Sequence, residues 1–597
     1  MSYTAFSFFI FTAITITLYF LPPFRRHQKI ILLAASYIFY AYADISCLGF
    51  ILATTLLTYL GALSIDAIQM SGKFRLKYAD AIRDTMELPD AHKRKGQKDP
   101  DKGPASPSDK GISSVPNKDS LSTSKAGEKK TASIQDAKDK VKNSTERVSK
   151  AILHLTLLSI FGILFFVKYV PFLLDTLRKL IAALTLEIPL EPLSILLPLG
   201  ISFYTFQAAG YLIDVSRGKY HAEPGFLRLA LFLSYFPQIV QGPISFYDKL
   251  SPQLYETHSF SFHRFKYGME LILWGYFKKS VIGDRIASVI PTVIGRYEEM
   301  SGAACLTALL IYAIQLYADF SAGIDISRGI SEILGIDLPE NFRRPYFSRN
   351  ISEYWRRWHI TLGEWMKNYI FYPIALSKKA VALRKKVKNS AFGKKSFGKH
   401  FSKMLPNMLA TLVVFLLVGI WHGAASRYVF FGIYNGVLIS VSMLLAPSFL
   451  ALRNKLHISE KSIPFILFQI IRTWIFILIG YVFDIALSVT MGFRFMWKIF
   501  TNFDLNLFLE KEFRKVFGKG VSGSQALLNY RILFISLLVL LIVGIIQEKS
   551  GRRIRDILDR KPFILQFAVL FVGILFTLIY GAYGSGYDVK GFVYMNF

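Results

Sequence analysis

Cysteine is nearly absent from this chain of 597 residues, and the two that occur, Cys47 and Cys305, stand in or beside apolar segments. This scarcity excludes a disulfide framework, a thiolate metal site and a dithiol redox motif. Several catalytic signatures are missing too, because no HExxH, GxSxG or GxxxxGK[ST] sequence occurs. No histidine is followed five residues later by aspartate, so the HxxxxD pattern of glycerolipid-type acyltransferases is also lacking.

Long apolar segments are abundant, and 52% of the residues are hydrophobic. This pattern excludes an ordinary soluble enzyme and predicts an all-α polytopic membrane protein with about a dozen transmembrane or re-entrant helices. The first segment has no positive charge before it and FRRHQK after it, the reverse of a secretory signal, so we expect a retained span with an outward-facing N-terminus. The predicted segments are residues 5–21, 30–42, 48–68, 151–170, 195–213, 226–240, 269–282, 304–318, 405–421, 428–445, 464–487, 533–546 and 563–580.

The net charge of +30 is concentrated between the apolar segments. Two predicted spans separate FRRHQK from the lysine-rich residues 72–150, so both regions should lie on one side, which the positive-inside rule makes cytoplasmic. The basic stretch 378–403 is expected there too. Nucleic-acid binding is another explanation of basic blocks, but these carry few aromatic residues and flank membrane spans. We therefore favour contact with the anionic headgroups of the lipid bilayer and predict no nucleic-acid partner.

Residues 72–150 are rich in Lys, Asp, Ser, Gly and Pro, where the surrounding chain is apolar. Such a composition cannot bury a core, so we predict a charged, disordered cytoplasmic insertion. A helical piece near residues 133–148 and a regulatory or partner-binding role stay open. The predicted organisation is N-terminal transmembrane helices over 1–71, the insertion over 72–150, a core over 151–448 and C-terminal transmembrane helices over 449–597.

His422 lies within the apolar run 412–433. An imidazole at bilayer depth indicates a functional site, because hydrocarbon offers the ring neither water nor a counter-charge. If the helix begins near Pro406, a favourable first-turn residue, His422 lies about 24 Å along it. A core histidine bonded to a neighbouring helix is the alternative. Small residues that leave space around the ring favour the functional interpretation: Gly419, Gly423, Ala424 and Ala425.

A second histidine, His359, stands in the segment WRRWHITLGEWMKNY, whose tryptophans and tyrosines suit the membrane interface. It is either an active-site residue or an interfacial histidine bonded to nearby backbone. The arginines of this region could hold the phosphates of an anionic donor or, equally, lipid headgroups. They are Arg343, Arg344, Arg349, Arg356 and Arg357.

Asp319 and Asp325 stand at the end of an apolar run, where carboxylates need partners. Asp325, Arg328 and Glu332 have the spacing at which residues of one helix pair. A structural network that neutralises itself is favoured over direct catalysis.

These motifs resemble those of the membrane-bound O-acyltransferase family, MBOAT, and most of all its bacterial branch with alginate O-acetyltransferase and the teichoic-acid D-alanyl transferase. The resemblance rests on LPLGISFYTFQAAGYLIDVSRG, YFPQIVQGPI, GYFKKSVIGDRIA, the long segment from LYADFSAGIDISRG to WRRWHITLGEWMKNYIFYPI, GIWHGAASRYVFFGIYNG and the terminal GFVYMNF. The order of these motifs is that of the family. Two departures are Gln241, where a small residue is common, and Ser-Ala-Gly-Ile-Asp at 321–325.

The resemblance implies helices in a ring around a thinned centre, with a tunnel through the membrane and an MBOAT catalytic core over residues 151–448. It implies His422 as the catalytic histidine and His359 as the second active-site histidine, with no metal and no bound cofactor. The donor substrate would be acyl-CoA, above all acetyl-CoA, or an acyl carrier thioester. Further residues are expected to bind substrate: Asp319, Asp325, Asn341, Arg356, Arg357, Trp358, Trp421 and Asn435.

The predicted reaction is transfer of an acyl group from a cytoplasmic thioester to hydroxyls of an extracytoplasmic polysaccharide or cell-wall polymer, at the plasma membrane of a bacterial cell. His422 would be the general base. An extracytoplasmic partner protein is expected, and an acyl carrier protein if the reaction is D-alanyl transfer to teichoic acid. A membrane transporter or flippase is the rival from another class, although the ionisable residues gather around one histidine block. A structural scaffold is a third reading.

Overall fold

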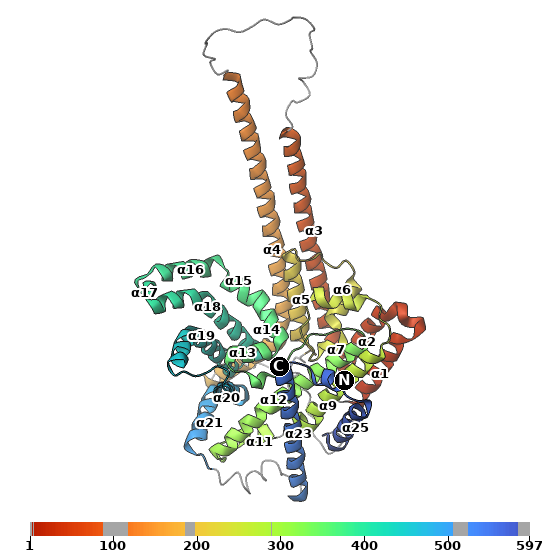
Figure 1. Cartoon of the computed structure of the whole chain (residues 1–597). Coiled ribbons are helices and arrows are strands. Elements are labelled where there is room, and N and C mark those ends of the chain that lie inside the picture. The colour runs from red at the N-terminus through yellow and green to blue at the C-terminus, as the bar shows by residue number, and fades with distance from the viewer. Residues whose placement is uncertain are drawn as a thin grey trace, which may run out of the picture. The chain divides into compact units, whose positions relative to one another are not determined.

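The protein is described here from a computed structural model, which covers residues 3, 5–87, 118–184, 198–287, 289–504 and 523–582 (Figure 1). Regular structure in these ranges is helical, apart from one isolated antiparallel bridge between Phe342 and Trp358. The longer helices are α1 (Phe6–Phe20), α2 (Gln28–Ala43), α3 (Leu48–Glu87), α4 (Lys118–Ala183), α5 (Ile201–Ser216), α9 (Phe262–Tyr276), α12 (Gly302–Ile333), α16 (Lys378–Asn389), α18 (Ser396–His422), α19 (Ser426–Lys455), α20 (Ile463–Ile485), α21 (Val489–Thr501), α23 (Gly523–Ser550) and α25 (Phe563–Tyr580).

Shorter helical pieces connect these elements. They are η1 (Pro22–His27), η2 (Ile45–Cys47), α6 (Phe226–Ser234), α7 (Phe236–Ile239), α8 (Tyr247–Tyr255), η3 (Phe277–Gly283), α10 (Asp284–Ile286), α11 (Val289–Gly295), η4 (Pro345–Phe347), α13 (Ile351–Arg357), α14 (Ile360–Met366), η5 (Lys367–Phe371), α15 (Tyr372–Ala375), α17 (Ala391–Lys394) and α24 (Ile554–Leu558).

Eight of the described helices are long and apolar enough to cross a membrane, and the number is nine if the bent pair Phe6–Phe20 and Pro22–Tyr42 forms one span. The eight are contributed by α3, α4, α12, α18, α19, α20, α23 and α25. The chain is therefore an all-α, multi-pass membrane protein, as the sequence predicts. Within the described residues these spans are fewer than the dozen or so transmembrane or re-entrant helices expected.

The difference arises where proline or a change of helix type interrupts an apolar segment. The segments predicted at 5–21 and 30–42 belong to the bent pair, whose halves meet at 92° beside Pro22. The segment predicted at 226–240 is split at Tyr235, because Pro237 lacks the N–H of a continuing helix and starts α7 instead. The segment predicted at 269–282 is divided between α9 and the π-helix η3.

The chain forms two compact units. The smaller consists of residues 56–160 and 212–224, and most of it is the antiparallel pairing of α3 with α4. A Cβ added at Gly61 would lie 2.6 Å from Thr156 Oγ1, and one added at Gly72 would lie 2.6 Å from Thr145 Oγ1. Close packing of small residues thus holds this pair together.

The predicted disorder of residues 72–150 is wrong for its two ends. Residues 72–87 continue α3, and residues 118–150 form the first half of α4, which includes the helical piece considered near 133–148. Asp80 pairs with Lys138 across the two helices. Charged surface residues that cannot build a core can still form helices when a partner helix covers one face. Residues 88–117 lie outside the described residues, as does the terminal GFVYMNF motif.

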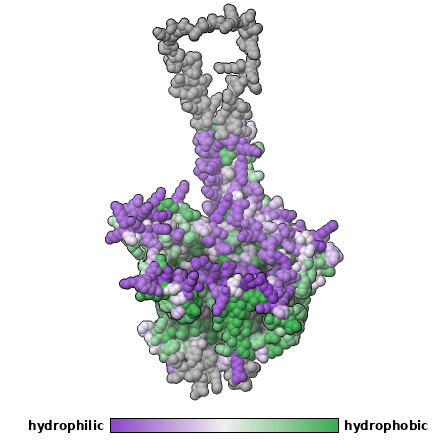
Figure 2. All heavy atoms as spheres, viewed as in Figure 1, coloured by the Kyte–Doolittle hydropathy of each residue, from purple (hydrophilic) through white to green (hydrophobic). Residues whose placement is uncertain are grey.

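The larger unit, residues 1–55, 161–211 and 225–597, is built around α12. The most apolar part of α12 is 61% buried, whereas that of α25 is 6% buried, so α12 is interior and α25 peripheral. Figure 2 shows hydrophobic side chains gathered in a belt on the visible face of this unit, with hydrophilic ones beside it. On α25, Phe563, Ile564 and Ile579 are exposed, as lipid contact requires.

Glycines let the central helices approach closely at two crossings. A Cβ added at Gly329 of α12 would lie 2.6 Å from the carbonyl oxygen of Gly268 in α9. A Cβ added at Gly432 of α19 would lie 2.3 Å from the carbonyl oxygen of Phe415 in α18. Backbone meets backbone at both crossings, so a larger residue cannot be accommodated by a side-chain rotation.

We expect Gly432→Ala to lower the free energy of unfolding by about 1–3 kcal/mol, because its methyl group would push α18 and α19 apart. Gly162→Ala in α4 is the matched control, since nothing lies within 4 Å of a Cβ at that position. The control should be neutral or up to about 1 kcal/mol more stable, because alanine favours a helix. Thermal unfolding of the purified proteins in detergent measures both, and equal midpoints for the two variants would contradict the crossing geometry.

Candidate active site

His422 is the last residue of α18. The prediction that this helix begins near Pro406 is wrong, because α18 begins at Ser396 and includes Pro406 in its interior. The apolar run 412–433 is likewise two helices, since α19 begins at Ser426. His422 therefore lies at the corner between two helices, where its buried ring is 5.5 Å from the ring of Phe431.

The C-terminal end of α18 is capped by α4. Tyr169 donates a hydrogen bond of 2.6 Å to the carbonyl oxygen of Ile420, and Lys168 donates to that of Trp421. The last carbonyls of a helix lack partners within it and carry partial negative charge, which a lysine side chain complements. The ammonium group of Lys168 also lies 5.7 Å from the centre of the Trp421 ring. These contacts fix the end of the helix that carries His422.

His359 stands between α13 and α14 in the left-handed backbone region, at φ 46° and ψ 54°. This conformation is uncommon for a residue with a Cβ and indicates a position that the surrounding structure determines. The backbone N–H of Ile360 donates to the carbonyl oxygen of Asn341 at 2.9 Å and the ring of Phe320 packs edge-on at 4.8 Å. His359 is itself buried.

The side chain of Asn341 determines which nitrogen of His359 carries the proton. Its Oδ1 accepts hydrogen bonds from the backbone N–H of Thr361 at 3.0 Å and from the Thr361 hydroxyl at 3.0 Å. This atom is therefore an acceptor, and the Nδ1 of His359, 3.1 Å away, must donate to it. The lone pair of the neutral ring then lies on Nε2, the atom that can accept a proton or a hydrogen bond.

Electrostatics keep the His359 ring neutral. Burial, together with the neighbouring His422, lowers the pKa of His359 to about 3. A charged imidazolium would lose its hydration in this site, so the neutral form prevails at pH 7.

Trp421 joins the two histidines. The centre of its ring lies 6.0 Å from that of His359 and 5.2 Å from that of His422. The structure thus brings together the two histidines that the sequence singled out, along with Asn341 and Trp421, in one buried cluster. Residues 63 positions apart in the chain meet here because the α13–α14 turn packs on the end of α18.

The other residues predicted to bind substrate lie in different surroundings. Asp319 forms an ion pair of 2.6 Å with Lys279, and Asp325 one of 2.7 Å with Lys278, as the favoured structural interpretation requires. Trp358 stacks at 5.7 Å on Tyr354. Their role in binding substrate stays a prediction.

Asn435 and Arg357 have polar partners other than the two histidines. Asn435 accepts a hydrogen bond of 3.1 Å from the Nε1–H of Trp355. Arg357 is paired with Glu353 at 2.6 Å and with Glu548 at 3.0 Å, whereas Arg356 is exposed. Substrate binding by these three residues stays a prediction as well.

Sequence reasoning missed Thr361, Lys168 and Glu548. Thr361 accepts a hydrogen bond of 3.0 Å from the backbone N–H of Ile244, and its hydroxyl donates one to Asn341. It therefore links the YFPQIVQGPI motif to the partner of His359. One clue to Thr361 was available in the sequence, because it stands two residues after His359 in the histidine motif. Nothing local marks Lys168 or Glu548, because their partners are far away in the chain.

We expect Asn341→Ala to lower the turnover of the proposed reaction by about 10–100-fold, the usual effect of losing a residue that orients a functional histidine. Three donors would lose their shared acceptor, so the free energy of unfolding should also fall by about 1–3 kcal/mol. The control is Asn454→Ala, at an exposed position one residue before the end of α19. A turnover in Asn341→Ala equal to that of the control would contradict the tautomer assigned to His359.

The comparison with known proteins agrees with these motifs. Residues 219–390 match the family model of MBOAT, the membrane-bound O-acyltransferase family. A probable alginate O-acetylase AlgI of Pseudomonas putida is 32% identical over 284 residues, which are 48% of this chain and 53% of that protein. A peptidoglycan O-acetyltransferase of Helicobacter pylori is 30% identical over 315 residues, 48% of this chain and 54% of that protein.

A teichoic acid D-alanyltransferase of Bacillus subtilis is 28% identical over 249 residues, 40% of this chain and 58% of that protein. The chain thus spans about half the length of the curated relatives that it matches. The matched range 219–390 contains His359 together with Asn341 and Thr361, the two residues of its hydrogen-bond network. This chain carries a domain of the membrane-bound O-acyltransferase family.

Proposed function

We propose that this protein is a membrane-bound O-acyltransferase that moves an acyl group from a cytoplasmic thioester to hydroxyls of an extracytoplasmic polysaccharide or cell-wall polymer. The observation that carries the proposal is the buried pair of histidines linked by Trp421, one of which has its tautomer fixed by Asn341. A buried neutral imidazole is suited to proton transfer, because its lone pair is not occupied by a proton at pH 7.

In the proposed reaction the oxygen of the acceptor hydroxyl attacks the thioester carbonyl carbon. His422 takes the hydroxyl proton as the C–O bond forms. The C–S bond then breaks, and His422 returns the proton to the departing thiolate, so the ester and a free thiol are the products. The sequence offers no activated serine or cysteine, so direct attack needs fewer assumptions than an acyl-enzyme.

His359 is assigned an orienting role. The sequence left two roles for this residue, orienting the thioester or donating toward its carbonyl oxygen. With Nδ1–H donating to Asn341, the neutral ring has no second proton to donate. Its Nε2 can accept a hydrogen bond from the acceptor hydroxyl or from an amide of the donor, which supports the orienting role.

The donor that we favour is acetyl-CoA, because two of the relatives are named as O-acetylating enzymes. The acceptor is proposed to be an extracytoplasmic polymer, reached through the tunnel that the family resemblance implies, with a separate extracytoplasmic partner protein. We further propose that the protein lies in a bacterial plasma membrane with its basic loops cytoplasmic and its N-terminus outside. D-alanyl transfer from a carrier protein is the second candidate, supported by the D-alanyltransferase relative.

Transfer of labelled acetyl groups from acetyl-CoA to polymer in membranes that contain the protein tests this proposal. Parallel assays with D-alanyl carrier protein separate the two donors. A transporter or flippase predicts no covalent product in either assay. Absence of labelled ester from both assays, with the protein folded and inserted, would refute the proposed function.

A further inference from the structure

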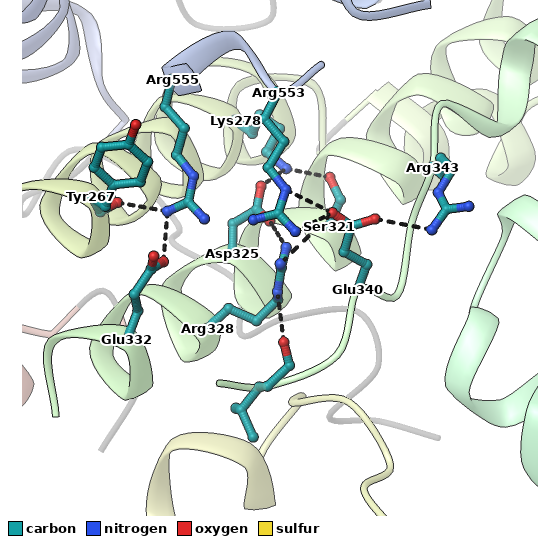
Figure 3. Close-up of polar contacts among 11 residues, drawn as sticks. Tyr267, Lys278, Ser321, Asp325, Arg328, Glu332, Glu340, Arg343, Arg553 and Arg555 are labelled. Carbon is teal, nitrogen blue, oxygen red and sulfur yellow. Dashed lines mark hydrogen bonds and ion pairs between the residues drawn. The ribbon is translucent and has the colours of Figure 1, made fainter. Parts of the chain in front are cut away.

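Charged residues gather around Glu340, in the segment that directly precedes Asn341 (Figure 3). We call this group the Glu340 cluster; its members are Lys278, Asp325, Arg328, Glu340, Arg343 and Arg553. Four cations face two carboxylates, so the cluster has an excess of two positive charges. Arg555 and Glu332, which Figure 3 also shows, form a separate pair at 2.6 Å and add no net charge.

The inner half of the cluster is compensated. The side chain of Lys278 is 2% exposed and pairs with Asp325 at 2.7 Å, and it also donates to Ser321 at 2.6 Å. Arg328, 13% exposed, lies 3.8 Å from Asp325 and donates to the carbonyl oxygen of Leu338 at 3.3 Å. A buried cation must have such partners, because its hydration is lost. These contacts are structural.

The outer half carries the excess charge. The side chains of Arg343 and Arg553 are 60% and 50% exposed, and within the described part of the chain both form their ion pairs with Glu340. Arg343 makes one contact of 3.3 Å with Glu340, and Arg553 makes two of 3.0 Å. A guanidinium group has five N–H donors, so several on Arg343 and Arg553 are available to a ligand. In Figure 3 the two arginines approach Glu340 from different elements.

Glu340 remains ionised within this group. Burial alone would raise its pKa, but the guanidinium groups of Arg328, Arg553 and Arg343 outweigh burial, and the pKa lies below its ordinary value. One carboxylate thus holds three guanidinium groups close together without neutralising them. Such an arrangement is pre-organised for an anion, since the cost of bringing the cations together is already met by the fold.

The cluster is connected both to the active-site segment and to one end of the larger unit. Glu340 is the neighbour of Asn341, and the backbone N–H of Arg343 donates to the carbonyl oxygen of Arg357 at 2.9 Å. On the other side, Asp337 pairs with Arg264 at 2.9 Å. The ring of His258 lies against Gly335, and the carbonyl oxygen of His258 accepts a hydrogen bond of 2.8 Å from the side chain of Gln28, within FRRHQK. Our proposed topology assigns this end to the cytoplasm, where the donor is.

We propose that Arg343 and Arg553, held by Glu340, form a binding site for a phosphate group, which the acyl-CoA donor supplies. This inference rests on the proposed function for the identity of the donor. Guanidinium groups match phosphate oxygens through parallel hydrogen bonds, and two positive charges suit a phosphate monoester or diphosphate. Anionic lipid headgroups present the same chemistry and are the second source of the phosphate.

The test measures binding of coenzyme A and of inorganic pyrophosphate to the full-length protein in detergent by calorimetry, without turnover. The double variant Arg343→Gln/Arg553→Gln should weaken both by about tenfold or more, because charge-assisted hydrogen bonds are lost. Arg552→Gln is the control for loss of a surface charge: it removes one guanidinium group, where the double variant removes two, at an exposed position next to Arg553, and it should change affinity less than about twofold.

Glu340→Gln supplies a variant in which affinity should increase. The glutamine Oε1 can still accept hydrogen bonds from the arginines, while loss of the negative charge raises the excess charge from two to three, so coenzyme A should bind several-fold more tightly. An increase cannot be explained by misfolding. Equal affinity of the wild type and the double variant for coenzyme A, together with equal binding to phosphatidylglycerol nanodiscs, would overturn the proposal. A loss in Arg552→Gln as large as in the double variant would overturn it as well.

The same variants distinguish coenzyme A from lipid as the source of the phosphate. They also distinguish failure of the phosphate site from failure of the proposed function. If only phosphatidylglycerol nanodiscs distinguish the wild type from the double variant, the site holds a lipid phosphate. If coenzyme A binds as expected but no acyl transfer occurs, the phosphate site stands and the proposed function fails. If transfer occurs, the double variant should have a raised KM for the donor and an unchanged kcat.

Discussion

Replacing His422 by alanine is expected to reduce acyl transfer by about 10²–10⁴-fold, the usual contribution of a positioned general base. The ring is buried at the end of α18, against Trp421 and Phe431, and the alanine variant leaves no base at that position. The fold should survive, because the end of α18 is held by main-chain contacts from Tyr169 and Lys168 that do not involve the imidazole. Labelled ester formed per molecule of inserted protein is the measurement.

The control for this experiment is His27→Ala, which removes an exposed histidine at the end of η1. It should have the wild-type rate. Both variants should show the same amount of protein in the membrane and thermal midpoints within a few degrees of the wild type. Normal acylation by His422→Ala at an equal protein level would show that His422 is not the general base.

Replacing His359 by asparagine is expected to reduce transfer by about 10²-fold while leaving the protein folded. Asparagine tolerates the left-handed backbone at this position better than most residues. Its amide can donate to the Oδ1 of Asn341 in place of the Nδ1–H, so the local network is preserved. What the variant lacks is an acceptor at the position of Nε2, the atom that the tautomer leaves with its lone pair.

This substitution separates two roles of His359. If the residue only anchors Asn341, His359→Asn should retain most of the activity and His359→Ala should lose it. If Nε2 orients the substrate, both variants should lose activity alike, whereas only alanine should lower the thermal midpoint. Wild-type turnover in His359→Asn would therefore exclude Nε2 from the reaction.

Several features could be predicted from the sequence because their signals are local. Long apolar segments gave the all-α membrane class, and an imidazole between Gly419 and Gly423 marked the histidine motif. The spacing of Asp325 and Arg328 predicted their pairing on one helix. Each inference used residues within a few turns of one another.

The remaining features depended on residues far apart in the chain. From the sequence, the arginines near His359 were predicted to hold donor phosphates or lipid headgroups. In the structure Arg344 and Arg357 are paired with Glu548, about 200 residues further on. The helix of His422 extends back past Pro406 to Ser396. Residues 72–87 are helical although their composition suggested disorder, and α4 packs on this part of α3 where Gly72 meets Thr145 and Asp80 pairs with Lys138.

The amino-acid sequence by itself determined the class of this protein and its histidine motifs, because hydrophobic length and helical spacing act over short stretches of chain. Only the tertiary structure decided which nitrogen of His359 holds its proton, through Asn341, and which cations keep uncompensated charge, through Glu340. The physical reason is that a buried polar or charged group must find its partner where packing places one, and that partner need not be near in sequence.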